Sequence, residues 1–485
     1  SRYQPRGLQA TIFGAADAIH STGYSWNEIA SKISPDEVGT YSASVFGQVQ
    51  AEGHGGMMQN RMRGERVSTK NLALGLNTMS TDFINAYVTG SVGSTFTSTG
   101  ACATFLYNLK AAVQDMQAGR VRLAIVGSND CAVTPEVIEG FGNMSAHANE
   151  EGLKKLDGIT EGSANHRKTS RPFGENCGFT IGEAAQFIVL MDDALALEMG
   201  CKVLGSVADV FTNADGIKKS ITAPGPGNYI TMAKSVSLAK AIVGEKSVKY
   251  RSFILAHGSS TPQNRVTESL IYHRIAESSD IYNWPVAAPK AYVGHSIGPA
   301  SGDQVAMALG IFAENIMPGI TTIDKVADDV HNERLNIATG KQFSLPTEAQ
   351  WAYAAKGGQK SKGYQYSGSN NIADVAWYSD NAKRQSHPVG LKKPNELGLY
   401  DMTGNLWEFC LDNMSRSVYR MPREHNPFYG NKPSDGSYSK QKAMKVIRGG
   451  AYEFSEIENL VFMRDGATNN VRMADIGFRL VMSKD

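Results

Sequence analysis

Apolar positions in residues 1 to about 338 follow two spacings, which together predict an α/β fold. Within residues 102–118 they recur every three or four positions, which predicts an amphipathic helix: Ala103, Leu106, Leu109, Val113 and Met116. Short continuous apolar runs at 121–127, 187–191 and 252–256 lie beside glycine-containing turns and predict buried strands. Alternation of such elements favours a layered sheet between helices.

Beyond this region the pattern changes. Residues 347–355 predict one further helix, and the rest of the segment is rich in turn-forming sequences. Three of the five tryptophans also lie here, at positions 351, 377 and 407. We therefore place a boundary near Gly340 and expect two domains, residues 1–340 and an irregular, loop-rich α+β domain over 341–485.

Composition narrows the possible partners and compartment. The 48 basic and 47 acidic residues leave a net charge of +1, so we expect neither nucleic acid nor an anionic membrane as a partner. The five cysteines show no CxxC spacing, which favours reduced thiols and a cytoplasmic location. No long apolar run and no basic-apolar leader occur, so neither a membrane span nor a signal peptide is predicted.

One cysteine and two histidines are candidates for chemistry. Cys102 stands where an extended segment enters the predicted helix, and a helix N-terminus favours the thiolate and lowers a thiol pKa. A buried, inert thiol is the alternative interpretation. His257 and His295 each lie in a glycine-containing segment that we place at a strand end, where side chains of α/β sheets converge. Either histidine alone could be purely structural, but two in matching positions favour a shared site.

These segments carry a family resemblance. Thr-Gly-Ala-Cys-Ala-Thr at 99–104, Ala-His-Gly-Ser-Ser-Thr-Pro at 256–262 and Gly-His-Ser at 294–296 resemble, in this order, the signature of β-ketoacyl synthases of the thiolase-like superfamily. The resemblance covers residues 5–338, and residues 62–68 are similar to the FabY-like branch. It implies an α/β thiolase-like layered sandwich and a homodimer.

The resemblance also implies an acyltransferase activity, the decarboxylative Claisen condensation of an acyl thioester with malonyl on an acyl carrier protein. Cys102 would take the acyl group as a thioester. His257 and His295 would donate N–H bonds to the malonyl thioester oxygen, as neutral imidazoles, and stabilise the enolate. Lys290 and Glu268 match the supporting charged pair of the family. Condensation would need no cofactor.

Two segments of the family pattern have no counterpart here. The opening strand and helix, and the closing Gly-Phe-Gly-Gly-Asn-Asn segment, do not occur, so we expect a sandwich that is incomplete at both ends. In the family the closing segment supplies one of the backbone N–H donors of the oxyanion hole. That donor is expected to be missing.

Residues 341–485 carry a second resemblance, to the C-terminal half of the formylglycine-generating, sulfatase-modifying proteins with their C-type-lectin-like fold. The matching segments are 345–351, 395–408, 447–452 and 476–480. No cysteine occurs between Tyr452 and Asp485, so the copper-binding cysteine pair is absent and we expect no formylglycine-generating activity. The family's calcium site would correspond to Asp401 and Glu408, whose carboxylates are suitable ligands.

The sequence thus leaves two hypotheses. The first is a β-ketoacyl synthase acting in fatty-acid or polyketide synthesis. The second is a non-catalytic, chimeric or binding protein, in which the C-terminal domain recognises a ligand as lectins do. An acyl adduct on Cys102 would distinguish the first from the second.

Overall fold

The computed structural model describes residues 4–218, 225–339, 343–414, 444–468, 471 and 473–482. Its backbone contacts divide the chain into two units. Residues 1–314 and 318–341 form the first unit, and residues 315–317 and 342–485 form the second. The boundary predicted at Gly340 lies outside the described residues.

The first unit contains a four-stranded sheet in the order β2-β1-β3-β4. The strands are β1 (Val38–Ala43), β2 (Thr95–Phe96), β3 (Leu123–Asp130) and β4 (Ala184–Met191). β1 runs parallel to β2 and β3, and β4 runs antiparallel to β3. The predicted strands at 121–127 and 187–191 are thus confirmed as β3 and β4.

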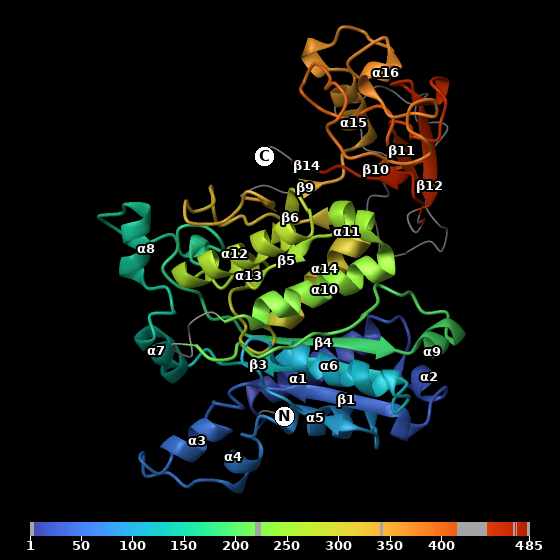
Figure 1. Cartoon of the computed structure of the whole chain (residues 1–485). Coiled ribbons are helices and arrows are strands. Elements are labelled where there is room, and N and C mark those ends of the chain that lie inside the picture. The colour runs from blue at the N-terminus through green and yellow to red at the C-terminus, as the bar shows by residue number, and fades with distance from the viewer. Residues whose placement is uncertain are drawn as a thin grey trace, which may run out of the picture. The chain divides into compact units, whose positions relative to one another are not determined.

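Helices cover both faces of this sheet, which explains why its central strand is apolar throughout (Figure 1). Leu123 and Ile125 of β3 pack toward α1 (Arg6–His20) and α5 (Met79–Ile84). Ala124 and Val126 point the other way, toward α6 (Thr104–Gln117). The helix predicted at 102–118 is confirmed as α6, although it begins two residues later.

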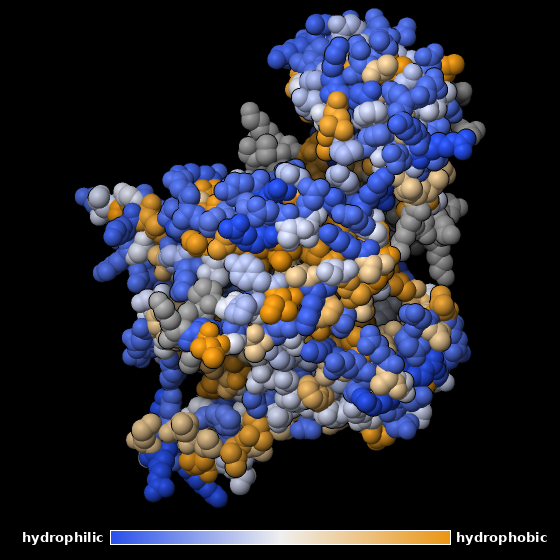
Figure 2. Space-filling view, in the orientation of Figure 1, coloured by the Kyte–Doolittle hydropathy of each residue, from blue (hydrophilic) through white to orange (hydrophobic). Residues whose placement is uncertain are grey.

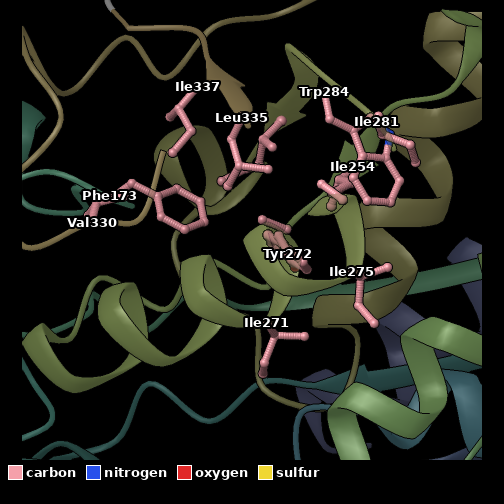
Figure 3. Close-up of a cluster of buried hydrophobic side chains, with 14 of the residues drawn as sticks. Phe173, Ile254, Ile271, Tyr272, Ile275, Ile281, Trp284, Val330, Leu335 and Ile337 are labelled. Carbon is pink, nitrogen blue, oxygen red and sulfur yellow. The ribbon is translucent and has the colours of Figure 1, made fainter. Parts of the chain in front are cut away.

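A second sheet, β5-β6-β8, lies in the same unit and is parallel throughout. Its strands are short: β5 (Ile254–Leu255), β6 (Trp284–Ala287) and β8 (Leu335–Ile337). Side chains of these strands pack against Ile271, Tyr272 and Ile275 of α12 (Pro262–Ser278) in the cluster drawn in Figure 3. This core fixes the ends of β5 and β6. Two candidate site residues follow these strands, His257 after β5 and Lys290 after β6.

The first unit contains ten other α-helices among its described residues. They are α2 (Trp26–Ala30), α3 (His54–Gln59), α4 (Thr69–Ala73), α7 (Pro135–Asn143), α8 (Glu150–Asp157), α9 (Asp193–Glu198), α10 (Gly227–Val243), α11 (Glu245–Arg251), α13 (Lys290–Val293) and α14 (Ala300–Glu314). Figure 1 shows α3 and α4 projecting away from the sheets. α14 packs on α6 and β4, which places its first turn beside the candidate site.

The second unit is irregular, as the turn-rich sequence predicts. It contains α15 (Glu348–Ala355), α16 (Ile372–Val375) and two small sheets of mainly antiparallel pairing, β12-β11-β10-β13 and β14-β9-β7. Their strands are β7 (Ile316–Met317), β9 (Phe343–Ser344), β10 (Trp407–Asn413), β11 (Met444–Arg448), β12 (Arg464–Thr468), β13 (Ile476–Gly477) and β14 (Val481–Met482). The helix expected at 347–355 is confirmed as α15. Trp351 is buried beneath this sheet of four strands.

In the part of the chain that the structure describes, no helix is both long and apolar enough to cross a membrane.

Candidate active site

Cys102 lies in the turn between β2 and α6 and is partly buried. Ala101, directly before it, has a φ of 48°, a left-handed conformation that is uncommon for a residue with a side chain. The hydroxyl of Ser301, at the start of α14, donates to the Cys102 carbonyl oxygen over 3.3 Å. The nucleophile candidate is therefore held in a strained turn before the helix, and not within the helix.

Burial is the main influence on the pKa of the Cys102 thiol. It raises the pKa of Cys102 above the ordinary value of 9.0, and the positive charge of Lys290 offsets only part of this effect. The sequence-based expectation of a lowered pKa is therefore wrong. A helix N-terminus two residues away acts weakly compared with the loss of water around the sulfur atom.

His295 stands beside Cys102. Its Nε2 lies 3.1 Å from the Cys102 Sγ, and its Nδ1 accepts the backbone N–H of Ile297 over 3.0 Å. A neutral imidazole that accepts at Nδ1 carries its proton on Nε2, so we assign the Nε2–H tautomer. This N–H points into the site, where a substrate oxygen could accept it.

The residues around His295 explain its position. Its backbone forms a bridge with Ile181, in which His295 N–H donates to the Thr180 carbonyl over 2.7 Å and Gly182 N–H donates to the His295 carbonyl over 2.8 Å. The Phe179 ring lies 5.0 Å from the imidazole, centroid to centroid. His295 follows α13, and not a strand end as the sequence predicted, because β6 stops at Ala287 and a helical turn intervenes.

His257 follows β5 by two residues, as predicted, and its ring lies 5.3 Å from that of His295. The Lys290 Nζ lies 3.2 Å from His257 Nδ1 and donates to the His257 carbonyl over 2.7 Å. Since the ammonium donates to Nδ1, His257 also carries its proton on Nε2. Burial and the Lys290 charge lower the pKa of both histidines well below 6.5, so both are neutral at physiological pH.

Glu268 binds the backbone of the His257 segment. Its carboxylate, on α12, accepts the backbone N–H of His257 at 2.6 Å and that of Gly258 at 2.8 Å, together with the Tyr272 hydroxyl at 2.5 Å. Lys290 and Glu268 thus bind different atoms of the His257 segment, and no ion pair within 4.0 Å joins these two described residues. Burial raises the pKa of the Glu268 carboxyl and lowers that of Lys290.

Among the described residues, Cys102, His257 and His295 form the one group of side chains spaced closely enough to bind a metal, with their ligand atoms within 4.8 Å of one another. Both histidines, however, turn an N–H and not a lone pair inward, and Lys290 would repel a cation. The group fits the binding of a partly negative oxygen better than it fits a metal ion.

Two buried carboxyl groups of the site were missed by the sequence interpretation. Asp303 accepts from the Ser296 hydroxyl and from Gln186 Nε2, which lies 2.8 Å away. Asp130, at the end of β3, accepts the backbone N–H of Gly298 over 2.9 Å. The sequence offered one weak signal for each residue. Asp130 is an acidic residue at the end of a buried strand, and Asp303 is an acidic residue in the first turn of the helix that follows the His295 segment.

The predicted calcium ligands of the second unit are already engaged. Both Glu408 oxygens are bound by the Arg479 guanidinium, at 2.6 and 2.7 Å, and Trp351 Nε1 donates to one of them at 2.7 Å. Asp401 accepts the Gly390 N–H over 2.7 Å, while its Oδ1 is buried without a described partner. With a guanidinium on Glu408, the pair does not fit a two-carboxylate calcium site.

Family models assign both parts of the chain. The β-ketoacyl synthase N-terminal domain matches residues 10–196 and the C-terminal domain of the same family matches 204–324. A sulfatase-modifying factor enzyme 1-like domain matches residues 306–484.

Individual relatives agree with this assignment. The chain is 55% identical over 338 residues to the β-ketoacyl-[acyl-carrier-protein] synthase FabY of Pseudomonas aeruginosa, which covers 70% of this chain and 53% of that protein. The crystal structure of that synthase gives a TM-score of 0.69. A chaperone protein, LppX of Paenibacillus barcinonensis, is 43% identical over 123 residues, 20% of this chain and 44% of its own length.

A β-ketoacyl synthase structure from Burkholderia phymatum, 19% identical, covers 71% of this chain and 79% of its own, with a TM-score of 0.58, and supports the fold alone. The chain spans about half the length of the curated relatives it matches. The thiolase-like fold expected for the first part, and both family resemblances, are confirmed. The chain therefore belongs to the β-ketoacyl synthase family, and its C-terminal part is a sulfatase-modifying factor enzyme 1-like domain.

Proposed function

We propose that the chain is a β-ketoacyl synthase that joins an acyl group to malonyl carried on an acyl carrier protein, in fatty-acid or polyketide synthesis. One observation carries the proposal: two neutral imidazoles with inward N–H groups lie beside a thiol in a family member. The domains we assign are residues 1–340 for the synthase and 341–485 for the C-terminal module.

In the first half-reaction, the Cys102 sulfur attacks the carbonyl carbon of the acyl thioester. The carrier thiol leaves and takes up the proton that Cys102 gives up, so the charge is conserved. Because the thiol pKa is raised, only a small share of Cys102 is thiolate at neutral pH. The positive charge of Lys290 favours that thiolate.

In the second half-reaction, malonyl loses carbon dioxide and the electron pair of the broken bond becomes a thioester enolate. The Nε2–H groups of His257 and His295 donate to the enolate oxygen, which is where negative charge develops. The enolate carbon then attacks the Cys102 thioester, a carbon–carbon bond forms, and the Cys102 thiolate departs. These steps use side chains of this chain and the two substrates.

A projecting segment supports a protein partner. Arg61, Arg63 and Arg66 are exposed on the segment between α3 and α4, and none of the described ion pairs includes them. Figure 2 shows hydrophilic and hydrophobic residues side by side on this projection. Met58, on α3, and Met62, which follows it, are both exposed. Such a surface favours a carrier with acidic and apolar side chains.

Two further features of the protein belong to the proposal. β2, at the edge of the first sheet, is exposed over both its residues, and pairing with a second copy would cover it in a homodimer. All five cysteines are free thiols, which supports the cytoplasm as the compartment.

The test is a condensation assay with acyl and malonyl carrier proteins, followed by mass spectrometry of the intact protein. We expect β-ketoacyl product and an acyl adduct on Cys102. Cys102→Ala should lose both, whereas Cys177→Ala, which changes a thiol outside the site, should keep both. Absence of product from the unmodified protein, or full activity of Cys102→Ala, would reject the proposal in favour of a binding protein.

A further inference from the structure

Asp130 is a fully buried carboxylate whose two oxygens share one partner, the Val45 N–H, and otherwise bind different ones. Oδ1 accepts the Ser44 hydroxyl at 2.7 Å and the backbone N–H groups of Val45 and Phe46 at 3.0 and 3.3 Å. Oδ2 accepts the Gly298 N–H at 2.9 Å and, more weakly, the Val45 N–H at 3.3 Å. Burial raises the pKa of Asp130 to about 6, so the group is mostly ionised at neutral pH. The carboxylate joins the end of β1 to the turn after His295.

That turn is strained and needs external support. Ile297 has a φ of 64°, which is rare for a β-branched residue and costs about 1–3 kcal/mol. In this conformation its N–H reaches His295 Nδ1. The bond from Asp130 holds the next residue, Gly298. A side chain at Gly298 has no room, since its Cβ would lie 2.6 Å from Asp130 Oδ2 and 2.7 Å from Ser128 Oγ.

The same turn contacts the nucleophile's helix. The Gly298 carbonyl accepts the N–H of Phe105, in the first turn of α6, over 3.4 Å. The Gly298 residue therefore lies between the helix that follows Cys102 and the backbone N–H that orients His295. A shift of Gly298 would therefore displace both Cys102 and His295.

We propose that Asp130 is a positioning residue of the condensing site: by holding Gly298, it keeps the Ile297 N–H on His295 Nδ1 and so directs the His295 Nε2–H toward the substrate. This inference rests on the proposed synthase function. The geometry separates it from a merely structural role, because Gly298 is bound by Oδ2 alone, whereas Ser44 and Phe46 are bound by Oδ1 alone.

Two substitutions test the two oxygens of Asp130 separately. Asp130→Asn keeps an oxygen for Ser44, Val45 and Phe46 and turns an NH2 group toward the Gly298 N–H, since this orientation preserves the three bonds to Oδ1 and loses the Gly298 bond and the longer Val45 contact to Oδ2. Ser44→Ala removes a donor from the other oxygen and leaves the Gly298 bond intact. Ser44→Ala disturbs the partners of Oδ1 and Asp130→Asn those of Oδ2, so Ser44→Ala is the control for loss of a buried hydrogen bond at Asp130.

The readouts are nitrogen NMR of 15N-histidine-labelled full-length protein, which distinguishes the Nδ1–H and Nε2–H tautomers, and the steady-state rate of malonyl carrier decarboxylation. For Asp130→Asn we expect mixed tautomers at His295 and a kcat lower by about ten- to a hundredfold with an unchanged KM, the usual cost of losing an orienting partner. Ser44→Ala should keep the single tautomer and a kcat within about twofold of the unmodified protein's.

A single, unchanged tautomer in Asp130→Asn, or a kcat loss no larger than that of Ser44→Ala, would overturn the inference. If the unmodified protein does not decarboxylate malonyl carrier, the proposed function fails, but the tautomer measurement still tests the role of Asp130. If Asp130→Asn does not fold, Gly298→Ala provides the same test, because its Cβ pushes the carboxylate off the Gly298 N–H. Gly298→Ala with an unchanged tautomer would equally refute the inference.

Discussion

Lys290→Met is the substitution whose effect follows most directly from the site geometry. Lys290 is almost fully buried, and its ammonium is the described donor to His257 Nδ1. Methionine has a similar length and volume but no donor, so Nδ1 can take the proton itself. His257 would then turn a lone pair inward for part of the time and lose its bond to the enolate oxygen.

The size of the effect follows from the value of one such donor. Removing one donor from an oxyanion site typically costs about 2.7–4 kcal/mol, or about a hundred- to a thousandfold in rate. Stability should change less, because the lost bond to the His257 carbonyl is offset by removing a buried charge. We expect the free energy of unfolding to shift by less than about 2 kcal/mol.

The assay is malonyl carrier decarboxylation, measured with urea denaturation of the same preparations. Lys155→Met, which changes an exposed lysine on α8, is the control and should keep the full rate. A folded Lys290→Met that retains more than about a tenth of the rate would refute the assignment of the His257 tautomer.

Three further predictions concern other groups. Because burial raises the pKa of Cys102, its alkylation by iodoacetamide should accelerate about tenfold per pH unit from pH 7 to 9, and a plateau below pH 8 would contradict this. Tyr272→Phe removes a donor to the buried Glu268 carboxylate and should lower the free energy of urea unfolding by about 1.5–3 kcal/mol; a loss below about 0.5 kcal/mol would be inconsistent with that bond. In the second unit, EDTA should leave thermal unfolding unchanged, whereas Arg479→Met should destabilise it by about 2 kcal/mol, since Glu408 loses its cation. A fall in melting temperature on adding EDTA would show that a bound metal supports this unit.

The sequence predicted those parts of the site that depend on local signals. Glycine-flanked motifs identified Cys102, His257 and His295, and apolar periodicity located α6, β3 and β4 to within a few residues at most boundaries. These signals are short-range, so a single chain carries them. The synthase and sulfatase-modifying resemblances likewise rest on contiguous motifs.

Long-range contacts were not predictable in the same way. Asp130 lies 168 positions from Gly298 along the chain, and nothing near either residue indicates that they meet. The pKa of Cys102 depends on how much water the folded chain excludes, which a helix start does not reveal. The Arg479 partner of Glu408 was missed for a related reason, because it is 71 positions away.

The strained residues beside the site have a consequence for selection in the laboratory. Ala101, Ser260 and Ile297 all have positive φ values and lie within three residues of Cys102, His257 and His295, respectively. At about 1–3 kcal/mol each, they consume a large part of the 5–15 kcal/mol by which a domain of this kind is stable. Evolving the chain for heat resistance should therefore favour glycine at these positions, and the hardier variants should be slower catalysts.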